Sequence, residues 1–96
     1  MSQTRDIVIQ CNVQCRPQGA VTRYRAWVGS ELFAERTWQW GDQYYLEETL
    51  VIRAEPGQYN IRYELVPGDQ GQITANHFRV LEGPASVTPS GLVEIR

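Results

Sequence analysis

The sequence predicts an all-β protein, a single antiparallel β-sandwich or jelly-roll-like domain of about eight short strands over residues 1–96. Apolar and polar residues alternate with a period of two along most of the chain. Segments that contain Pro and Gly interrupt this alternation at intervals of roughly ten residues. No stretch shows the period of about 3.6 residues that marks an amphipathic helix. A chain of 96 residues suits one hydrophobic core.

The first half of the chain contains three predicted strands, at residues 7–15, 20–28 and 31–40. In the first strand the odd-numbered residues from Ile7 to Cys15 are all apolar, so they share one face. The residues RPQG at 16–19 predict a turn, because Pro fixes φ and Gly admits positive φ. Gly29 and Ser30 predict a tight hairpin between the second and third strands.

The second half contains five predicted strands, at residues 44–54, 59–66, 73–81, 85–88 and 92–95. The nearly continuous apolar run at residues 50–52 predicts a strand at the centre of its sheet. The residues EPGQ at 55–58 predict a type II turn, and residues 67–72 predict a polar loop. In the strand at 59–66, alternation places Val66 on the outward face.

The two cysteines, Cys11 and Cys15, are four positions apart in one predicted strand. On a strand they share a face, and their Cα atoms are about 13 Å apart. A disulfide tolerates at most about 7 Å, so the two thiols do not bridge each other. We expect reduced, buried, structural cysteines, with Cys15 the more exposed because it ends the run. A zinc site would need two more ligands, and His77 is the only obvious one, so we expect no metal.

The charged residues exclude several classes of protein. All nine basic residues are Arg, and with eleven acidic residues the formal net charge is -2. Without Lys there is neither a Schiff-base lysine nor a phosphate-loop lysine. The mild acidity offers no electrostatic footprint for nucleic acid or an anionic membrane. The chain also has no signal-peptide pattern and no apolar stretch of about 18 residues, so we expect synthesis in a cytoplasm and no membrane insertion.

No set of side chains predicts catalysis. His77 is the one imidazole and lies on the polar face of its predicted strand, and no Ser occupies a G-x-S-x-G turn. Glu47 and Glu48 are neighbours on a strand, so they point to opposite faces and form no dyad. We expect such acids to balance Arg36 and Arg53 across strands. The sequence therefore predicts neither catalytic residues nor a bound cofactor.

Seven of the ten aromatic residues fall in the 22 residues from Tyr24 to Tyr45, which favours a binding role. Trp38 and Trp40 share a strand face. Either one fills the core and the other closes its end, or both join Arg36 as an anchor at a protein interface. The candidate partner-binding residues are Trp27, Arg36, Trp38, Trp40, Tyr44 and Tyr45. Trp27 shares the polar side of its predicted strand with Arg23 and Arg25, which suits cation–π packing. The same aromatics suit stacking on sugar rings, so a carbohydrate-binding module is the alternative.

The residues LFAERTW at 32–38, followed by an acidic, Tyr-rich strand and a Pro-Gly turn, resemble small all-β accessory proteins of tailed phages, particularly cyanobacterial phages. The resemblance covers residues 24–66. It implies a non-enzymatic virion protein made in the host cytoplasm, either a capsid decoration or cement subunit or a tail module. It also implies a homo-oligomer, often a trimer, that binds the major capsid or tail protein. Residues 50–65 are equally similar to carbohydrate-binding jelly rolls.

Overall fold

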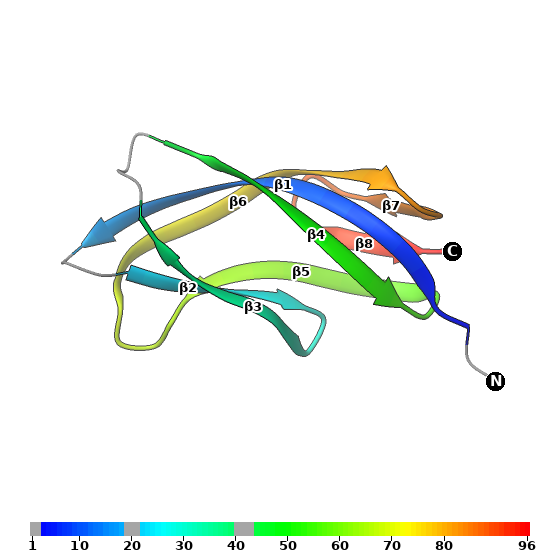
Figure 1. Ribbon diagram of the computed structural model, residues 1–96, viewed down its shortest axis with the longest axis horizontal. Helices are drawn as coiled ribbons and strands as arrows, with labels where there is room; N and C mark the ends of the chain where they lie inside the picture. The colour runs from blue at the N-terminus through cyan, green and yellow to red at the C-terminus, as the bar shows by residue number, and fades with distance from the viewer. Residues whose placement is uncertain (1–2, 19–21, 40–43) are drawn as a thin grey trace.

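The computed structural model describes residues 3–18, 22–39 and 44–96, which form two facing antiparallel sheets (Figure 1). The strands are β1 (Arg5–Gln18), β2 (Thr22–Val28), β3 (Glu31–Trp38), β4 (Leu46–Ala54), β5 (Gly57–Leu65), β6 (Gln70–Glu82), β7 (Ala85–Val87) and β8 (Leu92–Ile95). One sheet has the order β4-β1-β6 and the other the order β3-β2-β5-β8-β7. The predicted all-β sandwich of eight strands is therefore confirmed. Within these residues no helix is long and apolar enough to cross a membrane.

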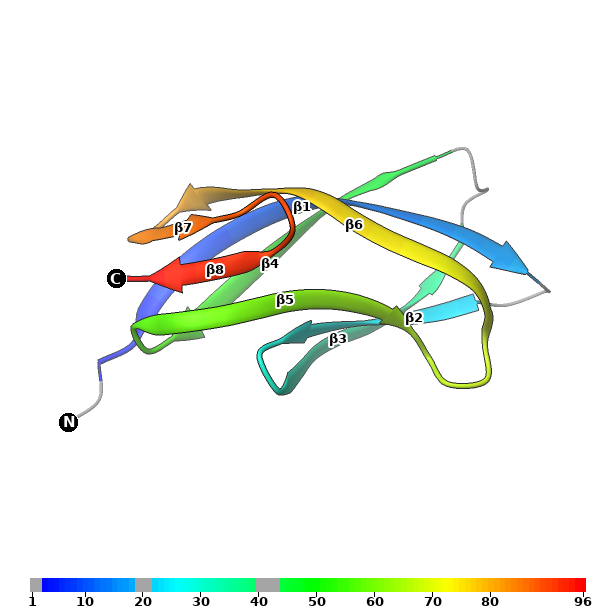
Figure 2. The same ribbon diagram turned by 180° about the vertical axis from the view of Figure 1, so that it is seen from behind.

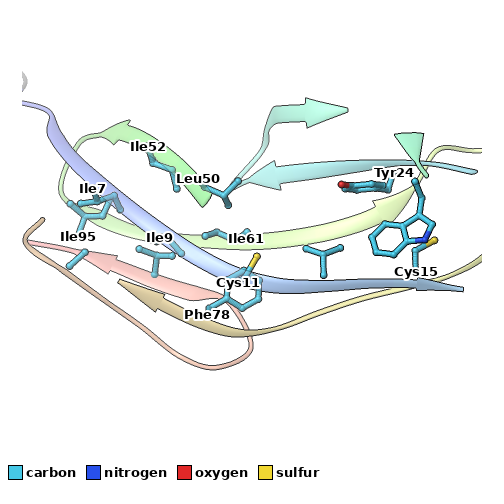
Figure 3. Close-up of a cluster of buried hydrophobic side chains, with 14 residues drawn as sticks. Ile7, Ile9, Cys11, Cys15, Tyr24, Leu50, Ile52, Ile61, Phe78 and Ile95 are labelled. Carbon is cyan, nitrogen blue, oxygen red and sulfur yellow. The ribbon is translucent and has the colours of Figure 1, made fainter. Parts of the chain in front are cut away.

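β1 supplies the centre of the core. It is the middle strand of the three-stranded sheet and pairs with β4 on one side and β6 on the other. Every residue of its apolar face is fully buried, as predicted: Ile7, Ile9, Cys11, Val13 and Cys15. Figure 3 shows labelled β1 side chains in the space between the sheets, together with Ile61 of β5 and Ile95 of β8. Burying one such aliphatic side chain stabilises the fold by roughly 1.5–3 kcal/mol.

β1 continues beyond its predicted end, so the prediction of a turn from residue 16 is wrong. Residues 16–18 belong to the strand, and Pro17 lies opposite Gly71 of β6. Pairing with β4 ends at Val13, so this last part of β1 has a single partner strand. Pro has no N–H to offer and is tolerated where only one neighbour must be paired. The predicted polar loop is correspondingly shorter, because β6 already begins at Gln70.

β4 is an edge strand, which corrects the prediction that its apolar run is central. It pairs with β1 alone, and Val51 is 67% exposed while Leu50 and Ile52 on the other face are buried. Periodicity reports which face a residue occupies, but it does not report how many strands lie beside it. The predicted type II turn is also absent: Gly57 has φ of 152° and opens β5 in the opposite sheet.

The prediction that Cys15 is the more exposed of the two cysteines is wrong, and so is the outward position predicted for Val66. Cys15 is fully buried because the strand and its pairing with β6 run on past it. Val66 is buried because the chain folds inward after β5, where its backbone N–H donates to the carbonyl of Arg23 at 3.0 Å. Cys11 and Cys15 are both free thiols, as predicted. The hairpin at Gly29 is confirmed by the pairing of β2 with β3.

We predict that Gly83→Ala destabilises the fold by about 3 kcal/mol. Gly83 has φ of +101°, and a Cβ there would lie 2.6 Å from the carbonyl oxygen of Asp6 and from a methyl group of Ile7. Gly68→Ala is the matched control, because its φ of +94° imposes similar strain with no atom within 4 Å of the Cβ. We expect that control to cost about 1 kcal/mol in urea unfolding. Equal losses for the two variants would contradict the close approach of the β6–β7 turn to β1.

Candidate functional site

A carboxylate is buried between the two sheets. Glu48 lies on the inward face of β4, and its side chain is 3% exposed. The alternation of β4 predicts this face, since Leu50 and Ile52 share it. A buried carboxylate costs several kcal/mol unless its oxygens are paired and hydrogen-bonded. The groups that contact the Glu48 carboxylate therefore have to supply its hydrogen bonds and its opposite charge.

The partners come from the facing sheet and from β1, and together with Glu48 we call them the Glu48 cluster. Tyr24 of β2 donates its hydroxyl to Oε2 of Glu48, and Tyr63 of β5 donates to Oε1 at 2.9 Å. The Nε of Arg36 on β3 lies 3.8 Å from Oε1. The Sγ–H of Cys11 donates to the hydroxyl of Tyr63 at 3.6 Å. Five strands thus meet at one carboxylate.

Burial keeps the donors of the cluster protonated. It is the main reason that the pKa of each phenol, Tyr24 and Tyr63, is raised well above its ordinary value. The neighbouring carboxylate of Glu48 raises both pKa values further, because it would repel a tyrosinate. Burial also raises the pKa of the Cys11 thiol. A thiol held neutral is a poor nucleophile, so the cluster is suited to joining the sheets rather than to covalent chemistry.

Trp38 and Arg36 share a face, as predicted, but that face is turned inward. Trp38 is 5% exposed, and its ring meets the ring of Tyr24 edge-on with centroids 6.2 Å apart. This position corresponds to the interpretation in which one Trp fills the core. The side chain of Arg36 is 51% exposed and reaches from the edge of the sandwich towards Glu48. Trp40, the other half of the predicted pair, lies outside the described residues.

Trp27 makes a cation–π contact, but with a different Arg from the predicted ones. The guanidinium of Arg62 on β5 lies 5.1 Å from the centroid of the Trp27 ring. The indole N–H donates to Glu64 at 2.7 Å, and Arg62 donates to the same carboxylate at 3.0 Å. Arg23 and Arg25 precede Trp27 on its own strand, whereas Arg62 lies directly opposite Trp27 in the pairing of β2 with β5. Arg62 covers part of Trp27, which leaves less of the ring for a partner.

Tyr44 and Tyr45 are exposed, by 54% and 63% respectively. Tyr45 borders a shallow hollow of about 490 Å³ over the outer face of the three-stranded sheet. Arg79 crosses this face: it donates to Gln10 at 2.6 Å and to Glu47 at 2.8 Å. The hollow combines an aromatic ring with polar groups, and its lining is Asn12, Tyr45, Glu47, His77, Phe78, Arg79 and Pro89.

His77 lies at an irregularity of β6. It is exposed, as predicted, and the pairing register between β1 and β6 shifts at this point. Its φ of 55° makes it the one non-glycine residue with positive φ in the part of the chain that the structure describes. Such a bulge turns a side chain away from the regular alternation, which here places the imidazole beside Arg79 in the hollow.

A second hollow, of about 530 Å³, lies where the β2–β3 hairpin approaches the end of β4. Its apolar lining is Val28, Leu32, Phe33, Ile52, Ala54 and Tyr59, and its polar rim includes Thr4, Glu31, Arg53 and Glu55. Leu32 is 50% exposed and Phe33 37%. Sequence reasoning missed this hollow because its walls come from strands that are far apart in the chain. The one signal was the adjacent apolar pair Leu32-Phe33, which breaks the alternation.

Most of the ion pairs among the described residues connect two strands. Of the acids expected to balance Arg36 and Arg53, Glu48 does contact Arg36, whereas Arg53 pairs with Asp6 of β1 at 2.7 Å. The guanidinium of Arg53 lowers the pKa of Asp6. Among the described residues no three His, Cys, Asp or Glu side chains gather where they could hold a metal ion.

We predict that Glu48→Gln lowers the free energy of unfolding by about 2 kcal/mol, because an amide cannot accept both phenol hydrogen bonds and also face Arg36 as an anion. Glu47→Gln is the matched control on the neighbouring position, where the side chain is 53% exposed. It should change the stability by no more than about 0.5 kcal/mol. Urea unfolding followed by Trp fluorescence measures both. A Glu48→Gln variant as stable as the control would show that the cluster contributes little to joining the sheets.

Comparisons with known proteins find no relative of the chain. No protein-family model, no curated protein and no solved structure matches the chain. The geometry of the hollows, the Glu48 cluster and the sheet edges therefore provides the basis for a functional interpretation.

Proposed function

We propose that the chain is a non-enzymatic structural protein of a tailed-phage virion, most simply an oligomeric decoration or cement subunit that binds other capsid proteins. The proposal combines the resemblance of residues 24–66 to phage accessory proteins with the surface of the sandwich. In this interpretation the two sheets form a rigid body, and exposed apolar side chains make the contacts.

The hollow beside the β2–β3 hairpin is the observation that supports the proposal most directly. It has an apolar floor, with Ile52 and Tyr59 among its lining residues, and exposed Leu32 and Phe33 at its side. Charged groups such as Arg53 border it. An apolar centre with a polar rim is the usual anatomy of a protein interface. A volume of about 530 Å³ is enough for one or two large side chains of a neighbouring protein.

We predict that the purified protein co-sediments with capsids or tails assembled from the structural genes that neighbour its own coding sequence. Leu32→Asp should reduce the bound fraction about tenfold, because a carboxylate at the hollow would be desolvated without a partner. Leu81→Asp is the matched control: Leu81 is also 50% exposed, but it lies on β6. Failure of the unsubstituted protein to bind any such particle would overturn the proposal.

A second candidate function is carbohydrate binding, and the hollow beside Tyr45 favours it. Sugar sites combine an aromatic face with planar polar groups that bond to hydroxyls, here Glu47, Arg79 and Asn12. Tyr45→Ala should then abolish a saturable glycan signal on an array and in calorimetry. Tyr44→Ala, which removes an equally exposed ring outside that lining, should leave the signal unchanged. Absence of any glycan signal for the unsubstituted protein would eliminate this function.

A further inference from the structure

The two sheets have four terminal strands, and three of them carry features that discourage pairing with another chain. The pairing of β3 with β2 contains a register shift, which marks a bulge. β7 is only three residues long. β6 has two register shifts and contacts β7 near its end (Figure 2). Bulges, short strands and covering elements are the usual protection of a sheet edge.

Among the described residues, β4 shows no bulge and pairs with no strand other than β1. It is nine residues long and pairs with β1 through nine consecutive residues without a register shift. It contains no Pro, Gly or Lys. The free edges of β3 and β4 lie on the near side of the molecule in Figure 1 and on the far side in Figure 2. A regular edge strand with no bulge is a template for one more antiparallel strand.

The side chains of β4 fit a second copy of the same strand. In two antiparallel β4 strands related by a two-fold axis, the outward side chains of both copies lie on the same face only in every second register. The possible registers therefore differ by shifts of two residues. The register centred on Leu50 pairs the whole strand, with Leu46 opposite Ala54. In that register Glu47 of each copy lies opposite Arg53 of the other. A shift by two residues loses this match and places Glu47 opposite Val51 or Glu55.

The neighbouring strands extend this charge match across the pair. Within one copy Arg53 contacts Asp6 at 2.7 Å, and Glu47 contacts Arg79 at 2.8 Å. In the centred register the outer faces of the two sheets join into a row of alternating charge: Asp6 and Arg53 of one copy, then Glu47 and Arg79 of the second. Val51, which is 67% exposed, would lie opposite Thr49 of the second copy.

We propose that two copies of the chain associate through β4 in this centred register and form a continuous six-stranded sheet. This association gives a geometry to the self-assembly within the proposed function, but it rests on the sheet edge and does not require a virion. A two-fold pair of this kind can stand alone or form the repeating unit of a larger assembly.

The test uses charge reversal at the two paired positions. By sedimentation equilibrium the unsubstituted protein should show a concentration-dependent dimer. Glu47→Arg or Arg53→Glu alone should weaken dimerisation at least about tenfold, because each places like charges opposite one another at two symmetric points. An equimolar mixture of the two single variants should dimerise again, since both cross-strand pairs are then complementary. The double variant Glu47→Arg/Arg53→Glu should also dimerise. Far-UV circular dichroism confirms that each variant is folded.

A second measurement needs no variant. Amide hydrogen exchange in β4 should slow as the concentration of the unsubstituted protein rises, while exchange in β3 and β7 should not. A monomer at millimolar concentration, or single variants that fail to pair when mixed, would overturn the proposal. Such a monomer that still binds capsids would leave the virion function intact, whereas a dimer that binds no particle would refute only that function.

Discussion

The burial of one face of β1 is the constraint on which the rest of the molecule depends. Its five inward residues from Ile7 to Cys15 are fully buried, and the strand is paired on both sides. The inward residues of the facing sheet pack in one cluster with this strand and with Leu50, Ile52 and Phe78 of its two neighbours. Because β1 occupies the middle, β4 and β6 are forced to the margins of a sheet of only three strands. The edge position of β4 is thus a direct result of how the core is built.

The Glu48 cluster complements this apolar core at one end of the sandwich. Apolar packing tolerates sliding, whereas a carboxylate that accepts hydrogen bonds from Tyr24 and Tyr63 permits only one alignment of β4 against β2 and β5. The partly exposed guanidinium of Arg36 connects the cluster to the surface.

The sequence predicts the faces of strands well and their neighbours poorly. The alternating side chains of β1, and the inward position of Glu48, follow from a two-residue period that any strand obeys. Pairing partners depend on contacts between distant residues, so the edge position of Val51 and the Arg62 contact of Trp27 could not be read from the sequence. The continuation of β1 beyond Cys15 could not be predicted either, because it depends on pairing with β6.

In the candidate site, too, the sequence predicts some features and not the contacts between distant residues. The clustering of aromatic residues favours a binding role, but Trp38 fills the core, whereas Tyr45 lies at the surface. Their positions differ because β3 turns Trp38 towards Tyr24, and a sequence pattern does not reveal which face meets the opposite sheet. The hollow near Leu32 is formed by residues of β2, β3 and β4 together. A surface of this kind exists only once the strands are in place.

The long pairing of β1 also has a consequence for the order of folding. Val8 pairs with Glu82, so the three-stranded sheet cannot close until the chain has emerged as far as residue 82. The β2–β3 hairpin, in contrast, needs only neighbouring residues. Long-range pairing of this kind slows folding. Until β6 arrives, the thiols of Cys11 and Cys15 are exposed to oxidation, and afterwards the folded core encloses both.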